Sequence, residues 1–306
     1  MRSRMLILVA AGFLAIILVS CRRTPPAGAP STTATPSTDI YLYRLDRGFL
    51  PFGRRLFNIT NRPGYDNQPS WDGNDRLLYT SNQSGQADIY EIDFRTSSSS
   101  RVTATPESEY SPAVTPDGKA ISVVRVERDS TQRLWRFPAG GGEPSVILEN
   151  IKPVGYYAWL DSTTLALFVL GNPSMLQVAD TRSGTARVVT TNIGRSIQRV
   201  PGGRRASYLH RAGSKWLLET VDPSLGANGN FDVDTVATMP DSADYVVWRS
   251  ASVLYSAAGS RLLRLQLPSR TWEEIADLSG SGIRRITRLA LRPDGRRIAI
   301  VADEPQ

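Results

Sequence analysis

Short apolar segments alternate with tight turns along most of the chain, and one arrangement of them recurs. Its clearest copies are QPSWDGNDRLLYTS (68–81), SPAVTPDGKAISVV (111–124) and LALRPDGRRIAIV (289–301). Each copy has an apolar strand, a turn that contains Asp-Gly, and a second apolar strand. Asp-Gly favours tight hairpins because glycine accepts a positive φ and aspartate can hydrogen-bond its own backbone. The pattern therefore predicts antiparallel β-structure.

The turn also locates weaker copies of the unit. In each unit, the residue just before the turn is expected to belong to the innermost strand. From one unit to the next, these residues are separated by 43, 45, 40, 49 and 43 positions, which average 44. The positions are Trp71, Val114, Trp159, Arg199, Trp248 and Leu291. Arg199 fits poorly because the other five are apolar. A repeat of about 40–45 residues with several strands per unit is typical of a propeller blade. A β-sandwich is the alternative interpretation of alternating strands and turns.

The segments that follow each turn complete the unit. Second strands are expected at 77–80, 121–124, 165–170, 206–209, 253–255 and 298–301. Third strands are expected at 87–94, 132–137, 175–180, 215–222 and 261–267. The sixth unit reaches the end of the sequence before its third strand, but TDIYLYRLDRG (38–48) resembles ADIYEIDFRTS (87–97), and GRRLFN (53–58) follows it.

We therefore predict an all-β fold over residues 39–306, a six-bladed β-propeller of four-stranded blades whose last blade is closed by the N-terminal strand. In this arrangement 38–48 is the third strand of the last blade and 53–58 is its outer edge. Such closure pairs strand edges that would otherwise invite aggregation.

The first residues have the layout of a secretory signal. Arg2 and Arg4 precede an uncharged apolar run at 6–19, which is shorter than the roughly 20 residues of a spanning helix. Leu18-Val19-Ser20-Cys21 follows and resembles the bacterial lipobox, in which the cysteine is lipidated and becomes the first mature residue. We expect a lipoprotein signal peptide at 1–20 and lipidation of Cys21. An ordinary cleaved signal and an uncleaved anchor are the alternatives.

The segment after Cys21 has the composition of a linker rather than of a folded segment. Residues 22–38 read RRTPPAGAPSTTATPST and contain no aromatic and no aliphatic side chain larger than alanine. Such a segment cannot bury a core. We expect 21–38 to be a lipidated cysteine and a disordered tether that holds the domain at a membrane of the bacterial cell envelope, facing the periplasm or the exterior. Cys21 is the only cysteine, so no disulfide is expected.

Composition and motifs argue against several classes of function. The formal net charge is +7, but both signs are spread along the chain without a basic block, so nucleic-acid binding is not expected. His210 is the only histidine, which disfavours a histidine-based triad or a zinc site. An oxygen-rich stretch at 66–75 is best explained by turns, with a calcium contact as the alternative. We expect no catalytic residue, no metal and no cofactor.

The segments that lead into the inner strands carry the candidate binding residues. In a propeller they would lie at one mouth of the central channel. Tyrosine and arginine are enriched at protein interfaces because each combines a large contact area with directed hydrogen bonds. The predicted partner-binding residues, here called the mouth residues, are Tyr65, Asp66, Glu109, Tyr110, Tyr156, Arg195, Asp244, Tyr245, Arg285 and Arg288. The alternative is that the tyrosine rings pack between blades.

At WDGN, TPDG and RPDG, the chain resembles the WD40-like Pro-Asp-Gly repeats of the TolB propeller family. The stretch TNRPGYDNQPSWDGNDRLLYTSNQSGQADIYEID (60–93) carries the resemblance most clearly, and VTATPESEYSPAVTPDGKAISVV (102–124) repeats it. The resemblance implies a six-bladed envelope propeller that binds other proteins. The chain departs from TolB in three ways: it has no N-terminal α/β domain, its third to fifth units lack Pro-Asp-Gly, and its start indicates a lipid anchor where TolB is soluble.

Two classes of function follow from these features. The favoured hypothesis is a lipid-anchored, non-enzymatic propeller that binds envelope proteins. The alternative is a carbohydrate or small-ligand site in the channel, with or without hydrolase or lyase chemistry carried by carboxylates and by tyrosine or arginine. Glycosidase chemistry needs two carboxylates about 5–9 Å apart, and Asp66, Glu109 and Asp244 are the candidates for them.

Overall fold

A computed structural model of the chain describes residues 37–45, 56–83 and 85–303. The predicted signal peptide (1–20), Cys21 and all but the last two residues of the predicted tether lie outside the described residues. Every described residue belongs to one compact unit, Thr35–Gln306. None of the described segments is a helix with the length and apolar character needed to cross a bilayer.

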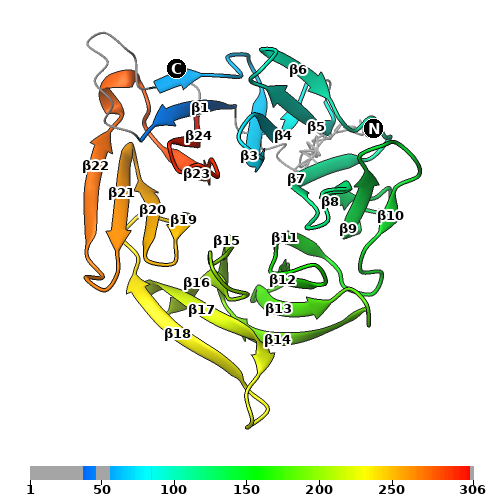
Figure 1. The fold of residues 1–306 in the computed structure, drawn as a ribbon, viewed down its shortest axis with the longest axis vertical. Helices are drawn as coiled ribbons and strands as arrows, with labels where there is room; N and C mark the ends of the chain where they lie inside the picture. The colour runs from blue at the N-terminus through cyan, green and yellow to red at the C-terminus, as the bar shows by residue number, and fades with distance from the viewer. Residues whose placement is uncertain (1–36, 46–55, 84, 304–306) are drawn as a thin grey trace, which may run out of the picture. The chain divides into compact units, whose positions relative to one another are not determined.

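The described strands form one eight-stranded sheet and four sheets of four antiparallel strands (Figure 1). The eight-stranded sheet divides into two antiparallel groups of four, called groups one and six here, which are joined by a single parallel bridge between Thr38 and Tyr65. Group one contains β3 (Tyr65–Asp72), β4 (Arg76–Asn82), β5 (Ala87–Asp93) and β6 (Ser98–Arg101). Group two contains β7 (Ser108–Val114), β8 (Ala120–Val126), β9 (Gln132–Pro138) and β10 (Ser145–Val146). Group three contains β11 (Val154–Trp159), β12 (Thr164–Val169), β13 (Met175–Asp180) and β14 (Thr185–Thr191). Group four contains β15 (Ile193–Arg199), β16 (Ala206–Ala212), β17 (Lys215–Leu225) and β18 (Phe231–Thr238). Group five contains β19 (Val246–Ser250), β20 (Val253–Ala258), β21 (Arg261–Gln266) and β22 (Trp272–Asp277).

Group six joins the two ends of the described chain. After a 3₁₀ turn at Ser279–Ser281 it contains β23 (Ile286–Leu291), β24 (Arg297–Asp303), β1 (Thr38–Arg44) and β2 (Leu56–Asn58). β1 pairs with β24 along its whole length, and β2 pairs with the other edge of β1. The expected pairing of the N-terminal strand with the last hairpin is confirmed over 38–44, while 46–48 lie outside the described residues. The strand begins at Thr38, one residue before the predicted domain boundary, and Thr38 also bridges to Tyr65 of group one.

Side chains of the turns explain why the hairpins form where the sequence predicts them. In the turn before β8, the Asp117 carboxylate accepts hydrogen bonds from the Thr115 hydroxyl at 2.6 Å and from the Lys119 N–H at 3.0 Å. Gly118 follows with a φ of 68°. Gly295 takes the same role before β24 with a φ of 69°. Both positions need the left-handed conformation that glycine adopts without a steric penalty.

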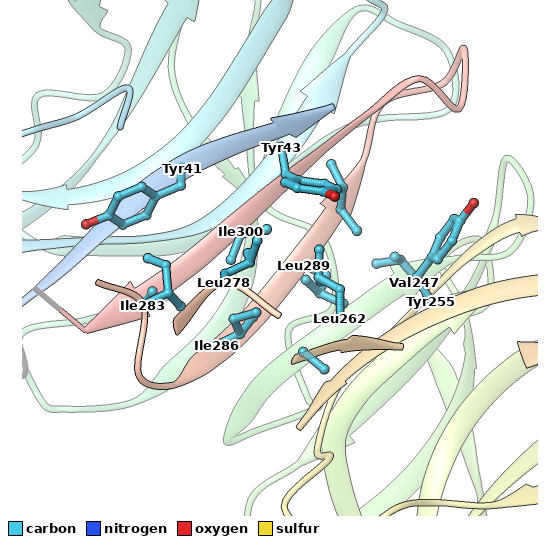
Figure 2. Packing of buried hydrophobic residues seen from close by; sticks show 13 residues of the cluster. Tyr41, Tyr43, Val247, Tyr255, Leu262, Leu278, Ile283, Ile286, Leu289 and Ile300 are labelled. Carbon is cyan, nitrogen blue, oxygen red and sulfur yellow. The ribbon is translucent and has the colours of Figure 1, made fainter. Parts of the chain in front are cut away.

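The apolar core lies between neighbouring groups. In the cluster of Figure 2, Tyr255 and Leu262 of group five pack with Tyr41, Leu289 and Ile300 of group six. Other buried clusters join group two to group three, group three to group four, and group four to group five. Since each group buries apolar side chains against the next, the groups depend on one another for their cores.

Indole groups add directed bonds across the same interfaces. Trp71 donates its indole N–H to the Ala290 carbonyl at 3.0 Å, which connects group one to group six. Trp159 donates to the Ser122 hydroxyl at 2.9 Å, from group three to group two. Trp248 donates to the Ser207 hydroxyl at 2.8 Å, from group five to group four. These bonds fix the angle and height at which adjacent groups meet.

Candidate functional site

The first strands of all six groups face one another (Figure 1) and line one cavity of about 390 Å³. The six residues that the turn register places on the innermost strands all line it: Trp71, Val114, Trp159, Arg199, Trp248 and Leu291. Arg199, the one poor match to the apolar pattern, donates from Nε to the Gly203 carbonyl of its own turn at 2.9 Å. The sequence register therefore locates the cavity wall correctly.

Four of the ten mouth residues line this cavity. They are Tyr156, Arg195, Tyr245 and Arg288, from groups three, four, five and six. Gln198, which the sequence analysis did not select, also lines the cavity and donates from Nε2 to the Tyr245 hydroxyl at 3.1 Å. The cavity thus brings together side chains that are far apart in the sequence.

Register shifts explain how the strand beginnings turn side chains toward the cavity. Shifts occur at 67–70 in β3, 110–113 in β7, 154–156 in β11, 193–197 in β15 and 286–288 in β23. A bulge bends its strand and re-aims the adjacent side chains. Tyr156 and Arg288 lie where the regular register resumes in β11 and β23.

Arg288 is held among aromatic rings. Its side chain is only 5% exposed. The guanidinium carbon lies 4.7 Å from the ring centre of Tyr156 and 5.4 Å from that of Tyr245. Burial acts to lower the pKa of Arg288, but the phenol groups of Tyr156, Tyr245 and Tyr65 outweigh it and the pKa is raised. Arg288 therefore stays positively charged in the cavity wall.

Tyr65 and Tyr110 stand in different surroundings. Burial raises the pKa of Tyr65 to about 12, and the charges of Arg288 and Arg195 act in the opposite direction. Tyr65 is therefore a neutral hydrogen-bonding group at neutral pH. Tyr110 packs against the apolar cluster between groups two and three, and burial raises the pKa of its hydroxyl as well. The alternative interpretation, in which a ring packs between groups, describes Tyr110.

Asp66 and Glu109 are fully buried beside the strand beginnings, and neither lines the cavity. Asp66 forms an ion pair with Arg62, while Glu109 accepts a hydrogen bond from Thr105 and lies 3.2 Å from Arg125 Nε. Burial is the largest influence on both carboxyl groups and raises their pKa values, against these partners. The contacts give the two acids a structural role at the start of β3 and β7.

The remaining mouth residues form exposed ion pairs. Arg195 and Asp244 lie 2.8 Å apart with side chains 37% and 56% exposed, so this pair connects groups four and five at the surface. Arg285 lies 3.3 Å from Asp303 on the same hairpin. Exposed pairs of this kind contribute little to stability and leave their side chains accessible.

The composition of the cavity wall limits its chemistry. Its polar lining comes from arginine, tyrosine, tryptophan, serine and glutamine side chains, and none of the described lining residues is Asp, Glu, His or Cys. Likewise, no cluster of three or more such residues in the described chain could hold a metal ion. His210 lies elsewhere, 3.2 Å from Glu219, a carboxylate that also accepts from the Tyr208 hydroxyl.

The fold resembles that of several solved structures. One is a protein assigned as TolB from Agrobacterium tumefaciens, with 14% sequence identity, a TM-score of 0.67, and coverage of 89% of this chain and 100% of that one. A second is the nidogen/laminin complex, with 10% identity, a TM-score of 0.59, and coverage of 83% and 97%. A third is a puromycin-hydrolysing peptidase from Mycobacterium tuberculosis, with 14% identity, a TM-score of 0.56, and coverage of 78% and 42%.

No protein-family model and no curated protein matches the sequence. Because the sequence identities to the solved structures are this low, the similarities show only the fold. Taken with the four-stranded antiparallel groups, they show an all-β, TolB-like β-propeller fold.

Proposed function

We propose that the chain is a six-bladed β-propeller, closed by its N-terminal strand, that acts as a non-enzymatic protein-binding module. The observation that carries the proposal is the gathering of tyrosine and arginine side chains from separate strand groups around one cavity, whose described wall has no carboxylate or imidazole. The six groups, the pairing of β1 with β24 and the Trp71 bond to Ala290 support the closed ring.

The mouth residues suit a protein partner for physical reasons. Tyr156 and Tyr245, whose rings pack against the buried Arg288, offer nearly rigid contact surfaces that lose little conformational entropy on binding. Around them the Arg195–Asp244 pair and Arg285 supply exposed charges of both signs. An aromatic centre with a charged rim is the usual anatomy of a protein interface.

We further propose that the propeller is a lipoprotein of the bacterial cell envelope. The support is the sequence alone: a positive start, an apolar run and Leu18-Val19-Ser20-Cys21, followed by a segment without core-forming residues. Residues 1–20 would be the signal peptide, 21–38 the lipidated cysteine and tether, and 39–306 the propeller. Labelled fatty acid should enter the wild-type protein and not a Cys21→Ser variant; equal labelling of both would refute the anchor.

Site-specific photocrosslinking in cells tests the protein-binding proposal. A photoreactive amino acid at Asp244 or Arg285 would lie among the mouth residues. Val188, on the outer strand β14 and 51% exposed, provides a matched control position. We expect one discrete crosslinked protein from positions 244 and 285 and none from 188. Crosslinks of equal yield at all three positions, or at none, would refute a specific interface at the mouth.

A small ligand in the cavity is the second candidate function. The volume of about 390 Å³ falls in the range of small-molecule sites. Hydrolase or lyase chemistry through paired carboxylates is not favoured, because Asp66, Glu109 and Asp244 pair with Arg62, Arg125 and Arg195 rather than with one another. Binding without catalysis is the version of this function that the geometry supports.

A further inference from the structure

Arg288 is a buried cation without an acidic partner. None of the ion pairs among the described residues includes it, although its side chain is 5% exposed. The nearby groups that raise the pKa of Arg288 are the phenols of Tyr156, Tyr245 and Tyr65. The buried acids of the same region differ, since Asp66 and Glu109 each have an arginine within ion-pair distance.

An uncompensated buried charge is destabilising because water no longer solvates it. Contacts with aromatic rings offset this only in part, since a cation–π contact is weaker than an ion pair with a carboxylate in the same setting. Arg199 also lines the cavity, with its Nε bonded to the Gly203 carbonyl, and Arg195 lines it while paired with Asp244; none of the described lining residues is acidic. Arg288 therefore carries a positive charge in the cavity wall that an anionic ligand would neutralise.

The donors around the cavity suit a planar anion. A guanidinium presents a rigid fork of N–H groups that matches the two oxygens of a carboxylate. Gln198 donates to the Tyr245 hydroxyl and holds it in place, and that hydroxyl can donate in turn to an anion in the cavity. A phosphate dianion would need a second free cation, whereas Arg195 is already paired with Asp244 at 2.8 Å.

We propose that the cavity binds a carboxylate group, with Arg288 as its anchor. The source of this carboxylate is an acidic residue of a partner polypeptide that enters the cavity. The choice of a polypeptide rests on the proposed protein-binding function, while the choice of a carboxylate rests on the cavity itself.

Calorimetric titration of the full chain in detergent tests the inference. The probes are a short blocked peptide with one central aspartate, the same peptide with asparagine, and glucuronate. We expect the aspartate peptide to bind and the asparagine peptide to bind on the order of 30-fold more weakly, the effect of losing one partner of a buried charge pair. Glucuronate should not compete with the aspartate peptide at equal concentration.

Three variants locate the binding. Arg288→Gln should weaken binding of the aspartate peptide on the order of 30-fold without lowering the melting temperature of the free protein, because it removes an uncompensated buried charge. Arg288→Lys keeps the charge but loses the fork, so an intermediate loss is expected. Arg261→Gln, an exposed arginine of β21 paired with Glu274 and outside both the cavity wall and the mouth residues, is the matched control and should bind as the wild type does.

Two results would overturn the inference. One is equal binding of the aspartate and asparagine peptides by the wild type. The other is binding of glucuronate with no binding of the aspartate peptide, which would assign the carboxylate to a sugar. Crosslinks from positions 244 and 285 that persist in Arg288→Gln, together with the first result, would leave the protein-binding function intact. Arg288-dependent peptide binding without any crosslink would instead refute that function and keep the carboxylate site.

Discussion

Replacing Ile40 by alanine tests whether the N-terminal strand is part of the cooperative fold. Ile40 lies in β1, opposite Val301 of β24, and its side chain is 0% exposed. It shares one apolar cluster with Ala299 and Val301 of group six and with Leu77 and Tyr79 of group one. A single side chain from the beginning of the chain thus fills the space between the last group and the first.

The expected cost follows from the packing. Truncation of a buried isoleucine to alanine costs about 2–5 kcal/mol, and more where the neighbours cannot move into the space. The neighbours here belong to hydrogen-bonded strands on both sides, so we expect about 3 kcal/mol. For a domain of this size each kcal/mol lowers the melting temperature by about 2–4 °C, which gives a decrease of about 6–12 °C. Such a cost is a large part of the 5–15 kcal/mol that typically stabilises a domain.

Urea unfolding followed by tryptophan fluorescence measures this cost on the full chain in detergent. Val233→Ala is the control, because Val233 lies on β18 and is 42% exposed. It should change the unfolding free energy by less than about 0.5 kcal/mol. If Ile40→Ala cost no more than Val233→Ala, or shifted only a minor early transition, the N-terminal strand would not be part of the cooperative ring.

Two further predictions concern contacts between adjacent groups. Hydrogen bonds from the Thr163 and Thr164 N–H groups and the charge of Arg204 outweigh the effect of burial and lower the pKa of Asp161 from 3.8 to about 2. Because solvent screens this partly exposed carboxylate and its half-exposed partner Arg204, Asp161→Asn should cost about 1 kcal/mol at pH 7. A lowered pKa contributes its full stability above the unfolded value and loses it as the pH falls through the folded value, so the difference from wild type in unfolding experiments should vanish between about pH 4 and 2. A difference independent of pH would contradict this assignment. Trp248→Phe removes the hydrogen bond from the indole N–H to the buried Ser207 hydroxyl. It should lower the free energy of unfolding by about 1–3 kcal/mol. In a double-mutant cycle with Ser207→Ala, additive costs of the two substitutions would show that the bond is not formed.

The inner part of each strand group was predictable because two local signals agree there. The turn residues mark where a hairpin reverses, and apolar residues on both sides show that the strands are buried. The predicted second strand 121–124 lies inside β8, and the predicted third strand 175–180 coincides with β13. The N-terminal strand was found in the same way, through its likeness to the third strand of the first unit.

The outermost strands gave no such signal. β6 has the sequence SSSR and all four of its residues are exposed, so it has no buried face and no apolar alternation. β14 has no fully buried residue and β18 buries only Val236 and Ala237, while their partners β13 and β17 carry more of the buried side chains. Backbone pairing therefore defines most of the length of these edges. A strand without a buried face cannot be distinguished from a polar loop by its residues alone.

The candidate site was predictable as a region but not residue by residue. The sequence selected Asp66 and Glu109 together with Arg288, since all three precede an inner strand. Their different roles depend on bulges, such as the one at 286–288, and on whether a residue such as Arg62 or Arg125 lies close enough to form an ion pair. A one-residue change of register moves a side chain to the other face of its strand, and the pattern of residues does not specify where that change occurs.

Buried charged side chains differ in this fold in whether they have a partner of opposite charge, and this difference distinguishes a structural role from a functional one. Asp66 and Glu109 are buried, and each has an arginine partner, so removing either partner would leave a buried acid uncompensated and destabilise the start of its strand. Arg288 is 5% exposed, nearly as buried as these two acids, and has no acidic partner among the described residues. A fold that only needed to fill this space would be more stable with a neutral side chain at 288. The proposed carboxylate ligand would supply the missing negative charge and so account for an arginine at this position.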